Sequence, residues 1–175
     1  LFNWGPVQLE FGGGWLEVEN TRIVAGAERT YDLDAYVLDM GIKFATGPFY
    51  FNINGYTGEN NSMLGQALID AALPVYDAVN DTIIDADAWG WHAVAGFKLN
   101  DMITFEAGYG GTELDTNVVN QVDADLTAYY LQARLSPAPV GSIIPEIGEV
   151  DYENNAADVD EGDSFYFGAV WKISF

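Results

Sequence analysis

The strongest constraint on this chain is the alternation of apolar residues with polar or small ones. Between Tyr36 and Phe44 every even-numbered residue is apolar, whereas the odd-numbered ones include Asp39, Gly41 and Lys43. A period of two is the mark of a β-strand with one apolar face. We therefore predict an all-β fold. The eight alternating segments are 7–15, 36–44, 49–54, 89–99, 103–110, 129–135, 142–148 and 165–175.

Helical membrane spans are excluded, because the longest apolar run is 71–76 and a helix needs about 20 apolar residues to cross a bilayer. A wall of strands needs apolar residues only at every second position. A soluble β-sandwich would also alternate, but its solvent face would be rich in Lys and Glu. The polar face here carries mainly Gly, Asn, Tyr and Gln. The pattern therefore predicts a transmembrane antiparallel up-and-down β-barrel.

The connections between these strands alternate in length, which is typical of barrels with short periplasmic turns and long outer loops. The short connections are 45–47, 100–101 and 136–139, and the long ones are 17–30, 57–88, 111–125 and 149–163. The long connections, counted with Asp32 and Asp34 at the adjoining strand end, hold 22 of the 27 acidic residues and two of the six basic ones. We therefore expect acidic outer loops on a barrel in a bacterial outer membrane, in contact with its lipid and lipopolysaccharide.

The composition excludes several other classes. A net charge of −21 without a basic run excludes nucleic acid as a partner, and the lack of cysteine excludes disulfides and thiolate metal sites. Catalysis has little support, because His92 is the only histidine and has apolar sequence neighbours. We expect no enzyme activity and no cofactor.

Aromatic residues gather near the strand ends and predict girdles at the two membrane interfaces. The lower girdle would comprise Trp4, Phe44, Phe49, Phe97 and Trp171, and the upper one Trp15, Tyr56, Trp89 and Phe165. The alternation also continues to the carboxyl terminus through Trp171, Ile173 and Phe175. This ending resembles the C-terminal signature by which outer-membrane proteins are recognised for barrel assembly.

The first six residues repeat the pattern of 43–48, in which a strand end precedes a tight turn, Gly-Pro and the next strand. We therefore expect residues 1–175 to form one barrel domain that lacks N-terminal strands. The run 143–148 (IIPEIG), the hairpin 41–56 and the terminal Phe175 resemble bacterial general porins of about sixteen strands. The resemblance implies the C-terminal half of a trimeric, water-filled pore for passive diffusion of small hydrophilic solutes.

Charged residues on the polar faces of the strands are the candidate pore lining. The basic ones lie on descending strands, close to the periplasmic end, and the acidic ones on ascending strands. They would impose a transverse field that selects solutes by charge, or they would form structural ion pairs or snorkel at the interface. These candidates are Glu10, Lys43, Lys98, Glu106, Arg134, Glu146 and Lys172.

The longest loop contains apolar residues at helical spacing between 62 and 73, and Pro74 would end the helix. Met63, Leu64 and Leu68 would then pack within the outer loops, narrow the barrel mouth or contact a neighbouring subunit. The acidic residues Asp158, Asp160 and Asp163 suggest half of a calcium loop. Solvated loop charge is the simpler interpretation of this cluster.

The sequence favours a porin with a mild cation preference, set by its acidic loops. The alternative is a complete eight-stranded barrel with a structural or adhesive role. Such a barrel must fill its interior with side chains, whereas many inward positions here are glycine. We therefore expect a wide pore. The inward glycines are Gly12, Gly14, Gly41, Gly90, Gly96, Gly108, Gly110, Gly148 and Gly168.

Overall fold

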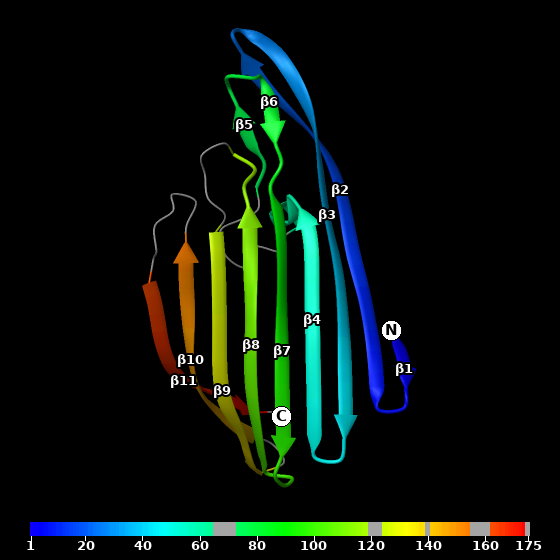
Figure 1. The fold of residues 1–175 in the computed structure, drawn as a ribbon, viewed down its shortest axis with the longest axis vertical. Coiled ribbons are helices and arrows are strands. Elements are labelled where there is room, and N and C mark those ends of the chain that lie inside the picture. Colours follow the sequence, from blue (N-terminus) through cyan, green and yellow to red (C-terminus); the bar gives the residue numbers. More distant parts are fainter. Residues whose placement is uncertain (65–72, 119–123, 139–140, 155–161, 174–175) are drawn as a thin grey trace.

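The computed structural model describes residues 1–64, 73–118, 124–138, 141–154 and 162–173. Within these residues, nine antiparallel strands form one sheet in which each strand pairs with its neighbour in the chain order β1-β2-β3-β4-β7-β8-β9-β10-β11 (Figure 1). Six of the eight predicted segments lie wholly within one of its strands, 89–99 extends one residue beyond β7, and 165–175 lies in β11 as far as the described residue Ile173. The strands are β1 (Phe2–Trp4), β2 (Val7–Val24), β3 (Ala27–Thr46), β4 (Phe49–Glu59), β7 (Asp87–Lys98), β8 (Ile103–Asp115), β9 (Ala124–Ala138), β10 (Gly141–Asn154) and β11 (Gly162–Ile173).

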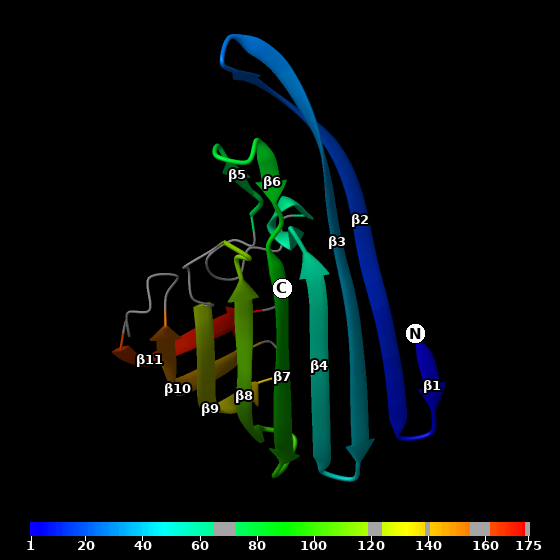
Figure 2. The same cartoon turned by 45° about the horizontal axis from the view of Figure 1, so that its top comes forward.

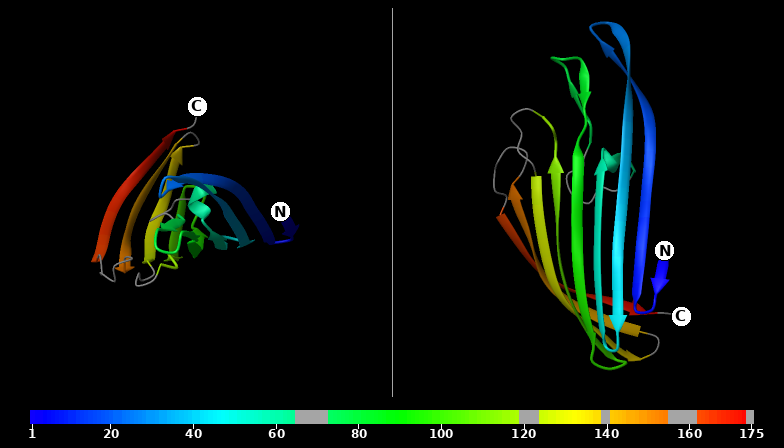
Figure 3. Two further views of the ribbon diagram at one scale, coloured as in Figure 1. Left: turned by 90° about the horizontal axis from the view of Figure 1, so that it is seen from above. Right: turned by 45° about the vertical axis from the view of Figure 1, so that its right-hand side comes forward.

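The sheet curves into an open arc, which is clearest from above (Figure 3). In the described residues, β11 pairs only with β10, and β1 pairs only with β2. β1 meets β2 through the turn at Gly5 and Pro6, where Gly5 has a φ of 59°. The strand end and tight turn predicted from the first six residues are therefore confirmed.

The prediction of a long loop at 17–30 was wrong. β2 and β3 pair without interruption up to Val24 and Ala27, and they form an arm that rises above the other strands (Figure 2). Ala25 and Gly26 connect them, both with positive φ (50° and 84°). Two positive φ values are the geometry of a type I′ turn, whose twist matches that of the strands. Residues 17–30 include acidic side chains, but charged side chains do not prevent strand pairing where the strands are exposed to water.

The other long connections are also shorter than predicted. β8 continues to Asp115 and β10 to Asn154. The connection 57–88 contains a separate hairpin of β5 (Val75–Asp77) and β6 (Thr82–Ile84). It also contains the short 3-10 helix η1 (Asn61–Leu64). Residues 65–72, which hold most of the predicted helix, lie outside the described residues.

The two faces of the sheet differ as the alternation predicts. The outward face is apolar and exposed, with Phe11, Leu38 and Phe51 among its side chains, and Phe49 packs on Phe97 with ring centroids 5.0 Å apart. Tyr56 was wrongly assigned to the upper girdle, because it lies on the inner face. In the described residues, no helix is long and apolar enough to cross a membrane.

Candidate functional site

The concave inner face of the sheet is the candidate site. Strand pairing brings all seven predicted charged residues to this face: Lys43 faces Gln8, Glu106 faces Gln132, and Lys172 faces Ser142. Two neighbouring concavities, of about 330 and 460 Å³, open on it near the short turns. Whether these charges select solutes stays a prediction.

Glycines and tyrosines face each other across the strands of this wall. Tyr50 pairs with Gly96, and Tyr130 pairs with Gly108. A Cβ atom added at Gly96 would lie 1.9 Å from Tyr50 Cζ, and one at Gly108 would lie 2.1 Å from Tyr130 Cε1. Both phenol rings therefore lie flat over glycine backbone instead of projecting into the interior.

The same arrangement recurs where Tyr56 covers Gly90 and Tyr166 covers Gly148. These contacts change the interpretation of the inward glycines. Gly90, Gly96, Gly108 and Gly148 do not simply leave space, because they provide the surfaces on which aromatic rings pack. The tyrosines are functional candidates that sequence reasoning missed. Their alternation was visible, but their glycine partners depend on strand register.

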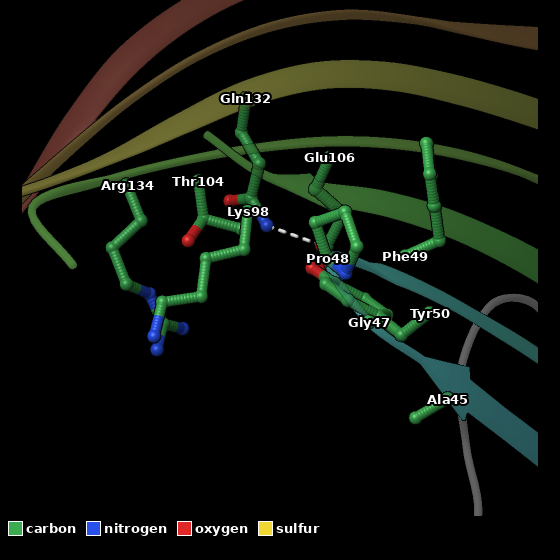
Figure 4. Close-up of a pocket in the computed structure, with 10 residues that line it drawn as sticks. All are labelled: Ala45, Gly47, Pro48, Phe49, Tyr50, Lys98, Thr104, Glu106, Gln132 and Arg134. Carbon is green, nitrogen blue, oxygen red and sulfur yellow. Dashed lines mark hydrogen bonds between the residues drawn. The ribbon is translucent and has the colours of Figure 1, made fainter. Parts of the chain in front are cut away.

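Glu106 is the centre of a hydrogen-bond network on this wall. Its Oε1 accepts hydrogen bonds from the Tyr130 hydroxyl, at 2.7 Å, and from the Gln132 amide, and its Oε2 accepts one from the Tyr50 hydroxyl. Figure 4 shows the bond from Gln132 on β9 to Glu106 on β8. Both carboxylate oxygens are therefore occupied by neutral donors, which hold the negative charge at one position.

The other charged residues are held to different degrees. Lys43 forms an ion pair with Glu10, with 2.8 Å between Nζ and Oε1, and Gln8 donates to the same oxygen. Glu146 accepts one hydrogen bond from Tyr166, at 3.0 Å. Lys98 pairs with Asp101 in the turn that follows its own strand, at 2.8 Å.

Two basic side chains stand apart from these pairs. Within the part of the chain that the structure describes, no hydrogen bond or ion pair engages the guanidinium of Arg134 or the ammonium of Lys172. Arg134 lines both concavities, and Lys172 lines the larger one. The prediction of structural ion pairs therefore fits Lys43 and Glu10 but does not describe the whole set.

η1 lies on the inner side of the wall, where Leu64 approaches Gly14 on β2: its Cδ1 lies 3.8 Å from the position of an added Cβ. The contact places η1 against the chain's own β2 and does not distinguish packing within the outer loops from narrowing of the barrel mouth. Met63, in the same turn, donates its backbone N–H to Asn60 O at 3.0 Å. Leu68 lies outside the described residues, and a narrowing role stays a prediction.

Asn60 fixes the point where the chain leaves β4, and sequence reasoning missed it. Its side chain is fully buried. The amide donates to Asp34 O and to Asp85 Oδ1, both at 2.8 Å, and accepts from the Ala86 N–H at 3.1 Å. Its φ of 48° lies in the left-handed region, which asparagine tolerates better than most residues.

The β5–β6 hairpin is attached to the β2–β3 arm by the contacts of Asp81, which we call the clasp. Asp81 accepts hydrogen bonds from the hydroxyls of Tyr31 and, at 2.9 Å, Tyr76, and it forms an ion pair with Arg29 at 3.4 Å. Arg22 lies over the Tyr76 ring, 4.5 Å from its centroid. The hydrogen bonds from Tyr31 and Tyr76, and then the charge of Arg29, hold the pKa of Asp81 below its usual value.

The remaining candidates are placed only in part. Trp171 and Ile173 lie on β11 with exposed side chains, whereas Phe175 lies outside the described residues. Asp158 and Asp160 also lie outside the described residues, whereas Asp163 lies on β11. Among the described residues, no group of three or more side chains could hold a metal ion. His92 faces Asn54 and Gly110 on the inner wall. The expectation that the chain is not an enzyme stays a prediction.

Comparison with known proteins bears on the fold. No protein-family model matches the chain, and no curated protein matches it. A solved structure described as outer-membrane expressed OmpT of Vibrio cholerae is 18% identical, with a TM-score of 0.60 over 97% of this chain and 53% of that one. The in-vitro folded OmpT, described as an outer membrane protein of Vibrio cholerae, is 17% identical, with a TM-score of 0.58 over 95% of this chain and 49% of that one.

This chain therefore spans about half the length of the solved structures that it matches. At such identities the likeness concerns the fold alone. The predicted fold class, a transmembrane antiparallel barrel wall of the outer-membrane type, is confirmed. Since barrels of this construction are found in outer membranes, the likeness supports the predicted bacterial outer-membrane location.

Proposed function

We propose that this chain forms part of an outer-membrane porin, a water-filled pore for passive diffusion of small hydrophilic solutes or ions. The observation that carries the proposal is the contrast between the two faces of the sheet. The outward face is apolar and exposed, and the inner face holds charged side chains at fixed positions around two concavities. A polar interior behind an apolar wall is the construction of a diffusion channel.

The proposal includes a mild cation preference, because the outer half of the chain carries most of its acidic residues. It also includes a homotrimer in contact with outer-membrane lipid and lipopolysaccharide. The open arc of nine strands favours a wall of a wider barrel. The alternative, a small closed barrel that acts as a structural or adhesive protein through its outer loops, would require β11 to pair with the opposite edge.

The test is reconstitution of the full protein that contains this chain into planar lipid bilayers. We expect stepwise conductance increments that scale with KCl concentration, and swelling of proteoliposomes in small sugars. A correctly folded, heat-modifiable barrel that conducts no ions would contradict the porin and favour the structural or adhesive alternative.

A further inference from the structure

We propose that Lys98, Arg134 and Lys172 form an anion-binding subsite near the periplasmic end of the inner wall. Its ligand class is a small solute that bears a carboxylate or a phosphate. This inference rests on the proposed pore function and extends it, because it assigns a chemical class of solute to one place on the wall. Its test contains an arm that does not depend on conduction.

Arg134 occupies the centre of the proposed subsite. It lines both concavities, together with Gln132. Lys98 lines the smaller concavity and Lys172 the larger one, so that a basic side chain flanks Arg134 on each side. Figure 4 shows the side chains of Arg134 and Lys98 extending towards the same end of the smaller concavity. Three cations therefore face one continuous region of the wall.

The nearby carboxylates do not neutralise this group by pairing with it. Glu106 lines the smaller concavity with Arg134, but its oxygens already accept from Tyr50, Tyr130 and Gln132. Glu146 lines the larger concavity, and its described hydrogen bond comes from Tyr166. No ion pair joins either carboxylate to Arg134 or Lys172 in the described residues.

Among the described residues, the one acidic partner that competes for these three basic side chains binds weakly. Lys98 pairs with Asp101, whose side chain is 97% exposed in the turn. Exposed ion pairs of this kind contribute little to stability, so that an incoming anion can displace Asp101. An unpaired guanidinium presents a planar fork of donors that matches a carboxylate or phosphate.

The size of the region fits a small ligand. Concavities of about 330 and 460 Å³ hold a molecule of metabolite size, not a polymer. The side chains reach into an aqueous interior, where water screens their charges. We therefore expect weak, rapidly reversible binding, which suits passage through a pore, because tight binding would block it.

The first arm measures current through the full protein in a planar bilayer. Potassium phosphate replaces KCl on the periplasmic side at constant ionic strength. We expect a saturable fall in current with phosphate, and at least a threefold loss of apparent affinity in Arg134→Gln and in Lys172→Gln. Arg134→Lys should retain more of the response than Arg134→Gln.

Lys43→Gln is the matched control, because it removes the same charge from the same wall. Lys43 is paired with Glu10 and lies outside both concavities. A conducting pore without a saturable phosphate effect would overturn the subsite and leave the proposed function standing. Equal losses in Arg134→Gln and Lys43→Gln would also overturn it, because the effect would then be one of net charge.

The second arm measures phosphate binding to the detergent-solubilised full protein by 31P line broadening, with folding checked by heat modifiability. Broadening that is lost in Arg134→Gln but kept in Lys43→Gln supports the subsite even if the protein does not conduct. No broadening with the folded wild-type protein would overturn it. A failure of the pore and a failure of the subsite are therefore separate results.

Discussion

At the scale of single residues, the wall depends on which side chains stand opposite glycine. Tyr50 lies over Gly96, Tyr130 over Gly108 and Tyr166 over Gly148. Each of these hydroxyls donates to an inner carboxylate, Glu106 or Glu146. Because a glycine lets the ring lie flat, the hydroxyl reaches along the wall to the acid. The glycines thus determine where the negative charges of the interior are held.

Gly96→Ala is predicted to destabilise the wall. The new Cβ would overlap the Tyr50 ring, and forcing extra carbon into a packed site costs about 1–3 kcal/mol. Unfolding of the detergent-solubilised protein in urea, followed by tryptophan fluorescence, measures the change in free energy. Gly168→Ala is the control, since an added Cβ there meets nothing within 4 Å. Equal effects of both substitutions would refute the packing argument.

Glu106→Gln is predicted to weaken the network. The new amide NH2 would face hydroxyl or amide groups that now donate to Glu106, so one donor would lose its acceptor. An unsatisfied polar group costs about 1–3 kcal/mol. The same urea titration measures the loss in free energy of unfolding. Glu146→Gln is the comparison: with one described hydrogen bond in place of three, it should cost less. The reverse order would contradict the central role of Glu106.

At the scale of elements, two groups of hydrogen bonds in the outer half hold together segments that are distant in sequence. Asn60 joins the end of β4 to β3 and to the residue before β7, through Asp34 and Ala86. The clasp at Asp81 joins β5–β6 to the β2–β3 arm. Both are held by hydrogen bonds, so that loop position does not depend on apolar burial alone.

Asn60→Ala should release η1 from the wall. It would leave the Asp34 carbonyl and the buried Ala86 N–H without this partner, at about 1–3 kcal/mol for an unpaired buried group, and alanine disfavours the positive φ. If the loop narrows the mouth, single-channel conductance of the full protein should rise. Asn80→Ala, in the exposed turn of β5–β6, is the control. Unchanged conductance in a folded Asn60→Ala pore would argue against narrowing by this loop.

The clasp should open only in acid. The hydrogen bonds from Tyr31 and Tyr76 lower the pKa of Asp81 in the folded state, so its carboxylate stabilises the clasp at neutral pH. That contribution is present above the ordinary aspartate pKa of about 3.9, and it is lost as the pH falls through the lowered value. Asp81→Asn should therefore loosen the hairpin at every pH.

A spin label reports the opening. The chain has no cysteine, so Val79→Cys, at an exposed position of the β5–β6 turn, gives one labelling site in it. We expect low mobility at pH 7 that rises only below about pH 4, and high mobility throughout in the Asp81→Asn background. The same mobility in both backgrounds at pH 7 would show that Asp81 does not hold the hairpin. The pKa of Asp77 in the same hairpin is also lowered, by its hydrogen bond with Asn80. Asp77 is present in both backgrounds, so it does not account for a difference between them.

At the scale of the whole molecule, charge is separated along the barrel axis. The acidic residues gather in the outer half, and Lys43, Lys98, Arg134 and Lys172 stand on the inner wall near the short turns. Solutes that enter from outside would therefore meet a negative field first and a locally positive wall later. The net selectivity depends on which field dominates at the narrowest point.

We predict that cations are preferred and that the preference declines with salt. Screening acts over about 10 Å at 0.1 M and about 3 Å at 1 M, so acidic loops at a distance from the permeating ion lose influence first. Reversal potentials of the full protein across KCl gradients at low and high mean salt measure this. An anion-selective reversal potential at low salt would show that the inner basic residues dominate.

The amino-acid sequence alone was enough to predict the strand period, the eight segments and the inner face of the seven candidate charged residues, because alternation in a strand is a local property. It also showed the tight turn at Gly5 and Pro6. It could not determine where β2 and β3 end, since polar side chains in water neither require nor forbid pairing. The turn at Ala25 and Gly26 carries a signal that was overlooked.

Which residues meet across strands became clear only from their three-dimensional arrangement. The covering of Gly96 by Tyr50, the filling of both Glu106 oxygens and the burial of Asn60 depend on register and on chain return, which couple positions up to 56 residues apart. The same holds for Arg134, which has no ion-pair or hydrogen-bond partner for its guanidinium among the described residues, because its neighbours Glu106 and Glu146 accept from other donors. Alternation is encoded within one strand, whereas partnership requires the whole sheet to be assembled.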